Sequence, residues 1–186
     1  MEELTDSALM KLVQGGDSSH LAVLFERHHL GLFRYLMQLS RNRAVSEDLT
    51  QEVFFRVLKY AGTYDPDLPF VVWLYRMGRN AFFDTLRSRS AEPMSAETLE
   101  IRSREPVPEE VFARKQERLL LEEALQTLSE EKREVLVLSR FHDLRYQEIA
   151  KIMKCEVGTV KVRVYRALRE LRERFCELRG EKLYDV

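Results

Sequence analysis

Residues 146–169, YQEIAKIMKCEVGTVKVRVYRALR, decide how the rest of the chain is interpreted. Their apolar residues recur at helical spacing on both sides of a short polar segment, which predicts a helix, a turn of about three to four residues, and a second helix. The first helix is expected to bury Ile149, Ala150 and Met153, and the second Val160, Val164, Leu168 and Leu171. This arrangement is a helix-turn-helix, whose second helix can enter the major groove of DNA.

The opposite face of the second helix has the chemistry that a polyanion requires. It carries Thr159, Val162, Tyr165, Arg166 and Arg169, with Lys161 and Arg163 on its flanks. The whole chain has a formal net charge of -1, so the positive charge is local. Lys and Arg can bind phosphates, while Thr159, Tyr165 and Arg166 are placed to reach base edges. The alternative is an ordinary solvated amphipathic helix in an all-helical core.

Length and composition are those of a globular protein of one or two small domains. The chain has 186 residues, of which 45% are hydrophobic. We expect it to be soluble and cytoplasmic, because no apolar run approaches the ~20 residues that cross a bilayer and the start MEELTDSALM does not resemble a signal peptide. Cys155 and Cys176 form no CxxC pair and are expected to be reduced thiols; a redox role stays open.

The periodicity predicts an all-α fold of two small helical domains joined by a flexible acidic linker. Residues 1–89 and 111–186 are helical in pattern, and residues 90–110 form the linker. In the first domain Gly15, Gly16 and Asp17 should end a first helix, Ser46 should cap a later one, and residues 65–69 should form a loop. In the second domain Ser129 should be an N-cap, with Glu130 and Glu131 in the first helical turn.

Three ordered motifs resemble a known family: DLTQEVFFRV at 48–57, PFVVWLYRMGRNAFFDTLR at 69–87, and LSEEKREVLVLSRFHDLRYQEIAKIMKCEVGTVKVRVYRAL at 128–168. Together they are similar to the extracytoplasmic-function (ECF, group IV) sigma factors of bacterial RNA polymerase. The resemblance implies a protein that directs core polymerase to promoters and helps to melt the DNA. Residues 1–89 would be the region 2-like domain and residues 111–186 the region 4-like domain. The implied partners are the beta-prime clamp helices, the beta flap, promoter DNA and an anti-sigma factor.

The resemblance assigns the first motif to polymerase binding. Asp48, Gln51 and Glu52 would meet basic and polar groups of the clamp helices, and either Phe54 or Phe55 would supply an apolar contact. For each residue, the alternative is that the aromatic ring is core and the acid is merely solvated.

The segment 59–89 is similar to the part of the family that melts and reads the minus-ten element. Tyr64 and the loop 65–69 would line the pocket for a flipped base, and Arg76, Arg79 and Asn80 would hold the non-template strand. Trp73 could be a stacking wedge, but its apolar neighbours favour a core position. Asp65 and Asp67 have no third ligand nearby, which favours a turn over a metal site; no metal or other cofactor is expected.

In the second domain, Thr159, Lys161, Arg163, Tyr165 and Arg166 match positions with which the family reads the minus-thirty-five element. The chain departs from the family pattern at Val162, where a small polar residue is common, at Lys154, where Gly is frequent, and at Glu156, a weak N-cap. Val162 cannot form hydrogen bonds but can touch a thymine methyl group, so we expect a thymine opposite it.

Two other functions fit the sequence less well. A stand-alone helix-turn-helix regulator would leave the first two motifs unexplained. An enzyme is not expected, because His20, His28, His29 and His142 lack ligand spacing and neither Ser nor Cys has a nucleophile context. The linker, with Glu92, Glu97, Glu100, Glu105, Glu109 and Glu110, is either a simple tether or an acidic mimic of RNA in the polymerase.

Overall fold

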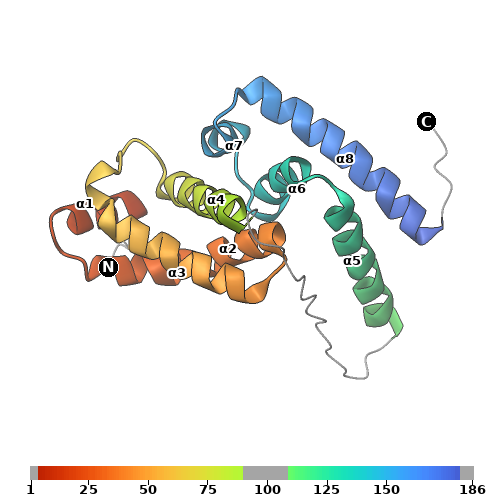
Figure 1. The fold of residues 1–186 in the computed structure, drawn as a ribbon, viewed down its shortest axis with the longest axis horizontal. Helices are drawn as coiled ribbons and strands as arrows, with labels where there is room; N and C mark the ends of the chain where they lie inside the picture. The colour runs from red at the N-terminus through yellow and green to blue at the C-terminus, as the bar shows by residue number, and fades with distance from the viewer. Residues whose placement is uncertain (1–3, 90–108, 181–186) are drawn as a thin grey trace. The chain divides into compact units, whose positions relative to one another are not determined.

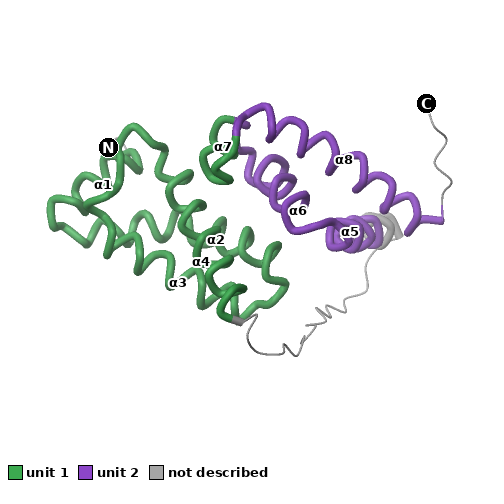
Figure 2. The backbone as a smooth tube through the Cα atoms, turned by 45° about the horizontal axis from the view of Figure 1, so that its top comes forward, with its two compact units in different colours: residues 1–99, 147–155 green, residues 100–146, 156–186 purple. Residues whose placement is uncertain are grey.

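The computed structural model describes residues 4–89 and 109–180, and within them all regular structure is helical (Figure 1). The predicted all-α class is therefore confirmed. The chain divides into two compact units, one made of residues 1–99 and 147–155 and the other of residues 100–146 and 156–186 (Figure 2). The domain ranges 1–89 and 111–186 remain predictions.

Four α-helices and a short 3-10 helix make up the larger part of the first unit. They are α1 (Asp6–Gln14), α2 (His20–Ser40), α3 (Arg43–Lys59), η1 (Ala61–Thr63) and α4 (Phe70–Arg89). Helices α2, α3 and α4 pack against one another, and α1 packs on α2. The fully buried side chains include Met10, Leu24, Leu32, Tyr35, Leu36, Phe70 and Leu74.

Helices α2 and α4 cross closely because two glycines lie at the crossing. A Cβ on Gly78 would approach Leu32 Cδ1 to 2.8 Å, and one on Gly31 would approach the Tyr75 hydroxyl to 3.0 Å. Both distances are shorter than ordinary van der Waals contacts, so glycine permits this packing. The crossing fixes α4, which carries part of the site described below.

The helix ends agree with the sequence at α1 and differ from it at α3. Helix α1 ends at Gln14 and is followed by Gly15 and by Gly16 with φ 100°, as predicted. The prediction for Ser46 is wrong: α3 begins at Arg43, and the Asn42 side chain caps it by accepting the Val45 N–H at 3.1 Å. Ser46 is buried one turn inside the helix and donates to Asn42 O at 2.8 Å. Asn and Ser both make good N-caps, and Asn42 is the one that the fold uses.

The remaining helices are α5 (Glu109–Thr127), α6 (Glu130–Leu136), the π-helical turn η2 (Val137–Phe141), α7 (Tyr146–Met153) and α8 (Val157–Arg179). Within the second unit, α8 packs against α5 and α6. Glu130 and Glu131 lie in the first turn of α6 as predicted, and Ser129 takes the N-cap position without a side-chain hydrogen bond. Helix α5 begins two residues inside the predicted linker, whose residues 90–108 lie outside the described part of the chain.

Candidate functional site

Helix α8 presents the predicted polar and basic face to solvent. Val162 and Tyr165 are 48% and 68% exposed, and Thr159, Lys161, Arg166 and Arg169 are exposed as well. The predicted buried stripe is confirmed at Val160 and Val164, which are buried. It is wrong at Leu168, which is exposed while its neighbour Ala167 is buried, and Leu171 is only half-buried. Residues 160, 164 and 167 follow the i, i+4, i+7 spacing of one helical face, and the bulk of Leu168 obscured that pattern.

On the predicted DNA-binding face of α8, two arginines lie within ion-pair distance of carboxylates. Arg163 is half-buried, and its Nη2 lies 3.5 Å from Glu131 Oε2 of α6. Arg169 Nε lies 3.6 Å from Glu173 Oε1, one turn along α8. Lys161 and Arg166 have no ion pair within the described residues. Lys161 and Arg166 can therefore bind DNA without first breaking an ion pair, whereas Arg163 and Arg169 would have to leave their carboxylates.

The turn before α8 shows the physical consequence of the departures from the family pattern. Lys154 adopts the left-handed conformation with φ 51°, which a glycine would take without strain. Glu156 occupies the N-cap position of α8, and its side chain makes no cap hydrogen bond. The weak cap expected from Glu156 is therefore observed.

The outer face of α3 carries the residues predicted to bind polymerase. Asp48, Gln51, Glu52 and Phe55 are exposed and follow the i, i+3, i+4, i+7 spacing of one face. The structure distinguishes the two phenylalanines: Phe55 is 68% exposed, whereas Phe54 is buried against Phe25 with ring centroids 4.9 Å apart. The sequence analysis missed Leu58, which follows Phe55 by about one turn, is also exposed, and extends the apolar part of this face.

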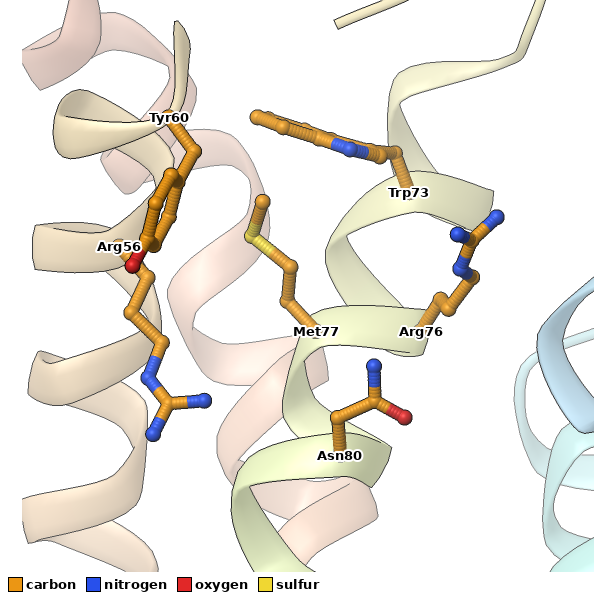
Figure 3. A pocket seen from close by; sticks show the side chains of 6 residues that line it. All are labelled: Arg56, Tyr60, Trp73, Arg76, Met77 and Asn80. Atoms are coloured by element: carbon orange, nitrogen blue, oxygen red, sulfur yellow. The ribbon is translucent and has the colours of Figure 1, made fainter. Parts of the chain in front are cut away.

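A pocket of about 210 Å³ opens between the C-terminal end of α3 and the side of α4. Arg56, Tyr60, Trp73, Arg76, Met77 and Asn80 line it (Figure 3). The α4 residues at positions 73, 76, 77 and 80 share one helical face, and this spacing is a signal that the sequence analysis overlooked. The lining of the pocket combines two aromatic rings and a thioether with two guanidinium groups and one amide. Such a lining suits a flat ring with hydrogen-bond acceptors at its edge.

The sequence analysis did not identify Arg56 as a site residue. This side chain lines the pocket and connects it to the outer face of α3. Its Nε and Nη2 lie 3.0 and 2.5 Å from Glu52 Oε1, and its Nη1 lies 3.8 Å from Asp84 Oδ2. The two carboxylates hold the guanidinium at the rim of the pocket.

The predicted minus-ten residues separate into two groups. Arg76 and Asn80 line the pocket, whereas the Arg79 guanidinium lies 4.6 Å from the centroid of the Phe83 ring and is not among the lining residues. Tyr64 is only 3% exposed, because its ring packs against Phe70 and Trp73. In this conformation the Tyr64 ring cannot stack on a base.

Trp73 is buried, as predicted, and also forms one wall of the pocket. Asp65 and Asp67 form the predicted turn, in which Asp67 N–H donates to Asp65 Oδ1 at 3.0 Å.

Among the residues that the structure describes, no cluster of metal-ligating side chains occurs. None of the described helices is long and apolar enough to span a membrane.

Two segments of the chain match known protein families. Residues 24–92 match the family described as Sigma-70 region 2, and residues 118–171 match Sigma-70, region 4. The chain is 30% identical over 173 residues to the RNA polymerase sigma factor CarQ of Myxococcus xanthus, covering 92% of this chain and 98% of CarQ. It is 28% identical over 176 residues to the ECF RNA polymerase sigma-E factor of Escherichia coli K12, covering 89% of this chain and 92% of the relative.

Two solved structures share the fold. One is CnrH in complex with the cytosolic domain of CnrY, with a TM-score of 0.69 and 24% identity over 90% of this chain and 95% of CnrH. The other is the sigma factor RpoE of Bartonella quintana with the anti-sigma factor NepR, with a TM-score of 0.66 and 22% identity over 86% of this chain and 96% of RpoE. With the helix-turn-helix elements, the exposed faces of α3 and α8 and the two matching regions, these findings show that the chain belongs to the extracytoplasmic-function sigma factors of RNA polymerase.

Proposed function

We propose that three surfaces divide the work of this sigma factor. The outer face of α3 binds the beta-prime clamp helices of core polymerase, the pocket beside it receives a base of the melted minus-ten element, and α8 reads the minus-thirty-five element. The observation that carries the proposal is the pocket, because it combines aromatic walls with cationic and amide donors next to an exposed acidic and aromatic helix face.

The α3 surface has the composition of a protein interface. Asp48, Gln51 and Glu52 surround the exposed ring of Phe55, so a partner with basic groups around an apolar patch would be complementary. An exposed phenylalanine one turn before the exposed Leu58 gains from being covered, at roughly 25 cal/mol for each Å² of apolar surface removed from water. The second unit is proposed to bind the beta flap.

The pocket would hold one unstacked base of the non-template strand. The walls formed by Tyr60, Trp73 and Met77 supply van der Waals contact, while Arg76 and Asn80 supply donors to base edges or phosphates. Tyr64 supports this pocket from inside through its contact with Trp73 rather than by lining it. Arg79, although outside the pocket, remains a proposed contact of the strand.

In the second unit, Thr159, Val162, Tyr165 and Arg166 are proposed to face the bases, and Lys161, Arg163 and Arg169 the phosphates. Their spacing on α8 supports this assignment, as does the exposure of all of them except the half-buried Arg163. A dedicated anti-sigma factor is the proposed regulator, because both structural relatives were solved with a partner, which for RpoE is named as an anti-sigma factor. We propose further that the protein acts in the cytoplasm and has no catalytic activity of its own.

The test is transcription by core polymerase with and without the purified protein on a library of promoters with randomised minus-ten and minus-thirty-five elements. Sequencing of the transcripts should reveal two enriched elements at a fixed separation. Arg76→Ala and Asn80→Ala should reduce enrichment at the minus-ten element only. If the protein instead protects duplex DNA alone and does not bind core, it is a stand-alone regulator and the proposal fails.

A further inference from the structure

The connection between η1 and α4 is held by side chains of α1, which precedes it by 47 to 57 residues in the chain. Gln14 Nε2 donates to two backbone carbonyls, Ala61 O of η1 at 3.1 Å and Tyr64 O at the start of the connection at 3.0 Å. Gln14 is exposed, so packing does not dictate its orientation. The two hydrogen bonds offset the conformational entropy that is lost when the Gln14 side chain is fixed in one rotamer.

A second set of hydrogen bonds holds the other end of the connection. The Tyr64 hydroxyl donates to Leu68 O at 2.7 Å, and since it carries one proton, Ser7 Oγ at 3.2 Å is the donor to it. Burial raises the pKa of the Tyr64 hydroxyl above its ordinary value, so it stays a donor. Leu68 N–H also donates to Asp65 O at 3.0 Å, which closes the turn.

Helix α1 is itself well anchored. Its residues Leu9, Met10 and Val13 are buried, and Asp6 accepts from Arg27 at 2.9 Å and lies 2.6 Å from His28 Nε2. Movement of the connection relative to the core would therefore break several hydrogen bonds. It would also move Tyr64, whose ring centroid lies 5.2 Å from that of Trp73, a wall of the pocket.

We propose that α1 is a positioning element for promoter recognition, and that Gln14 is its positioning residue, which sets the shape of loop 65–69 and of the pocket wall behind it. The inference rests on the proposed minus-ten role of this pocket. Gln14 touches no base in this scheme. It acts through Tyr64 and Trp73, so it should change which base is preferred rather than whether the protein folds or binds polymerase.

The test compares Gln14→Met with Lys11→Met in the full chain. Methionine has nearly the shape of glutamine but no N–H donors, and Lys11 is an exposed residue of the same helix with no hydrogen bond to the connection in the described structure. Holoenzyme made with each variant transcribes the randomised promoter library. Gln14→Met should lower the preference ratio at one or two minus-ten positions by about fivefold, as expected for the loss of hydrogen bonds worth ~1 kcal/mol. Core affinity should be unchanged, and the melting temperature should fall by no more than a few degrees. Lys11→Met should leave the ratio unchanged.

Three outcomes are informative. Unchanged minus-ten preference in Gln14→Met overturns the inference. A uniform loss of transcription on all minus-ten sequences, with a lower melting temperature, also overturns it, because it would show a merely structural role. Absence of any minus-ten preference in the unsubstituted protein would instead refute the proposed function of the pocket.

Tyr64→Phe provides an independent check, because it removes the hydroxyl but keeps the ring against Trp73. It should shift the minus-ten preference at the same positions as Gln14→Met. Shifts at unrelated positions would contradict a common positioning path.

Discussion

Val162 is the residue at which base preference is most open to test. It is half-exposed in the middle of the proposed groove face, and its side chain offers only methyl groups. A valine there can favour a thymine methyl by contact but gains nothing from a hydrogen-bonding base edge. Its neighbours Thr159, Tyr165 and Arg166 have polar groups, so the sequence preference opposite Val162 should be distinct.

Val162→Ser should weaken a thymine preference at one minus-thirty-five position while leaving the other positions unchanged. Val23→Ser on α2, where the valine is similarly exposed, serves as the matched control and should change nothing. Sequencing of the DNAs bound by the holoenzyme measures both. Selected sequences without a thymine preference in the unsubstituted protein would refute the idea.

Arg166 and Lys161 should separate base recognition from phosphate binding. Arg166→Ala is expected to cost ~1–3 kcal/mol and to relax sequence preference, whereas Lys161→Ala should weaken all sequences alike and lower the salt slope by about one. Holoenzyme affinities at several salt concentrations check this. Equal loss of discrimination in both variants would show that the groove face has been assigned wrongly.

At the scale of the element, α3 presents one face to the core and another to solvent. Phe54 lies in the core against Phe25, and Phe55, the next residue, lies in solvent. Adjacent helical residues point about 100° apart, so the same doublet can serve both the fold and a partner.

Phe55→Ala should reduce affinity for core polymerase by at least ~1 kcal/mol without changing the free energy of unfolding, because it removes an exposed aromatic anchor. Phe54→Ala should instead destabilise the protein by ~3–5 kcal/mol through a core cavity. Thermal unfolding and titration with core polymerase distinguish the two effects. A loss of core affinity confined to the Phe54 variant would reverse the assignment.

For the molecule as a whole, the sequence predicted the helical class and nearly all the exposed residues of α3 and α8, because those depend on local periodicity. It predicted less well what depends on tertiary contacts. Ser46 and Asn42 were both good caps locally, and the fold uses Asn42. Burial of Tyr64 and the part of Arg56 in the pocket follow from helices meeting across the first unit, which no short pattern reveals.

Whether the acidic linker is an RNA mimic or a simple tether is a question about the whole molecule, because the linker connects the two predicted domains. Of its six glutamates, Glu109 and Glu110 belong to α5, and the other four lie outside the described residues. If the linker mimics RNA, replacing Glu92, Glu97, Glu100 and Glu105 with Ser should change the pattern of abortive transcripts while sparing promoter affinity. Replacing the same residues with Asp, which keeps the charge, is the control. Unchanged abortive products in the Ser variant would favour a simple tether.

The backbone at Lys154 has a consequence for engineering. A lysine held at φ 51° costs roughly 1 kcal/mol that a glycine would not, part of which the flexibility of glycine in the unfolded chain would offset. Lys154→Gly should therefore raise the melting temperature slightly and remove one positive charge beside α8. Calorimetry and holoenzyme binding at low and high salt would measure the two effects; a lower melting temperature would mean that the lysine side chain stabilises the turn. A single substitution in the turn would thus raise the thermal stability of the protein and weaken its electrostatic attraction to DNA.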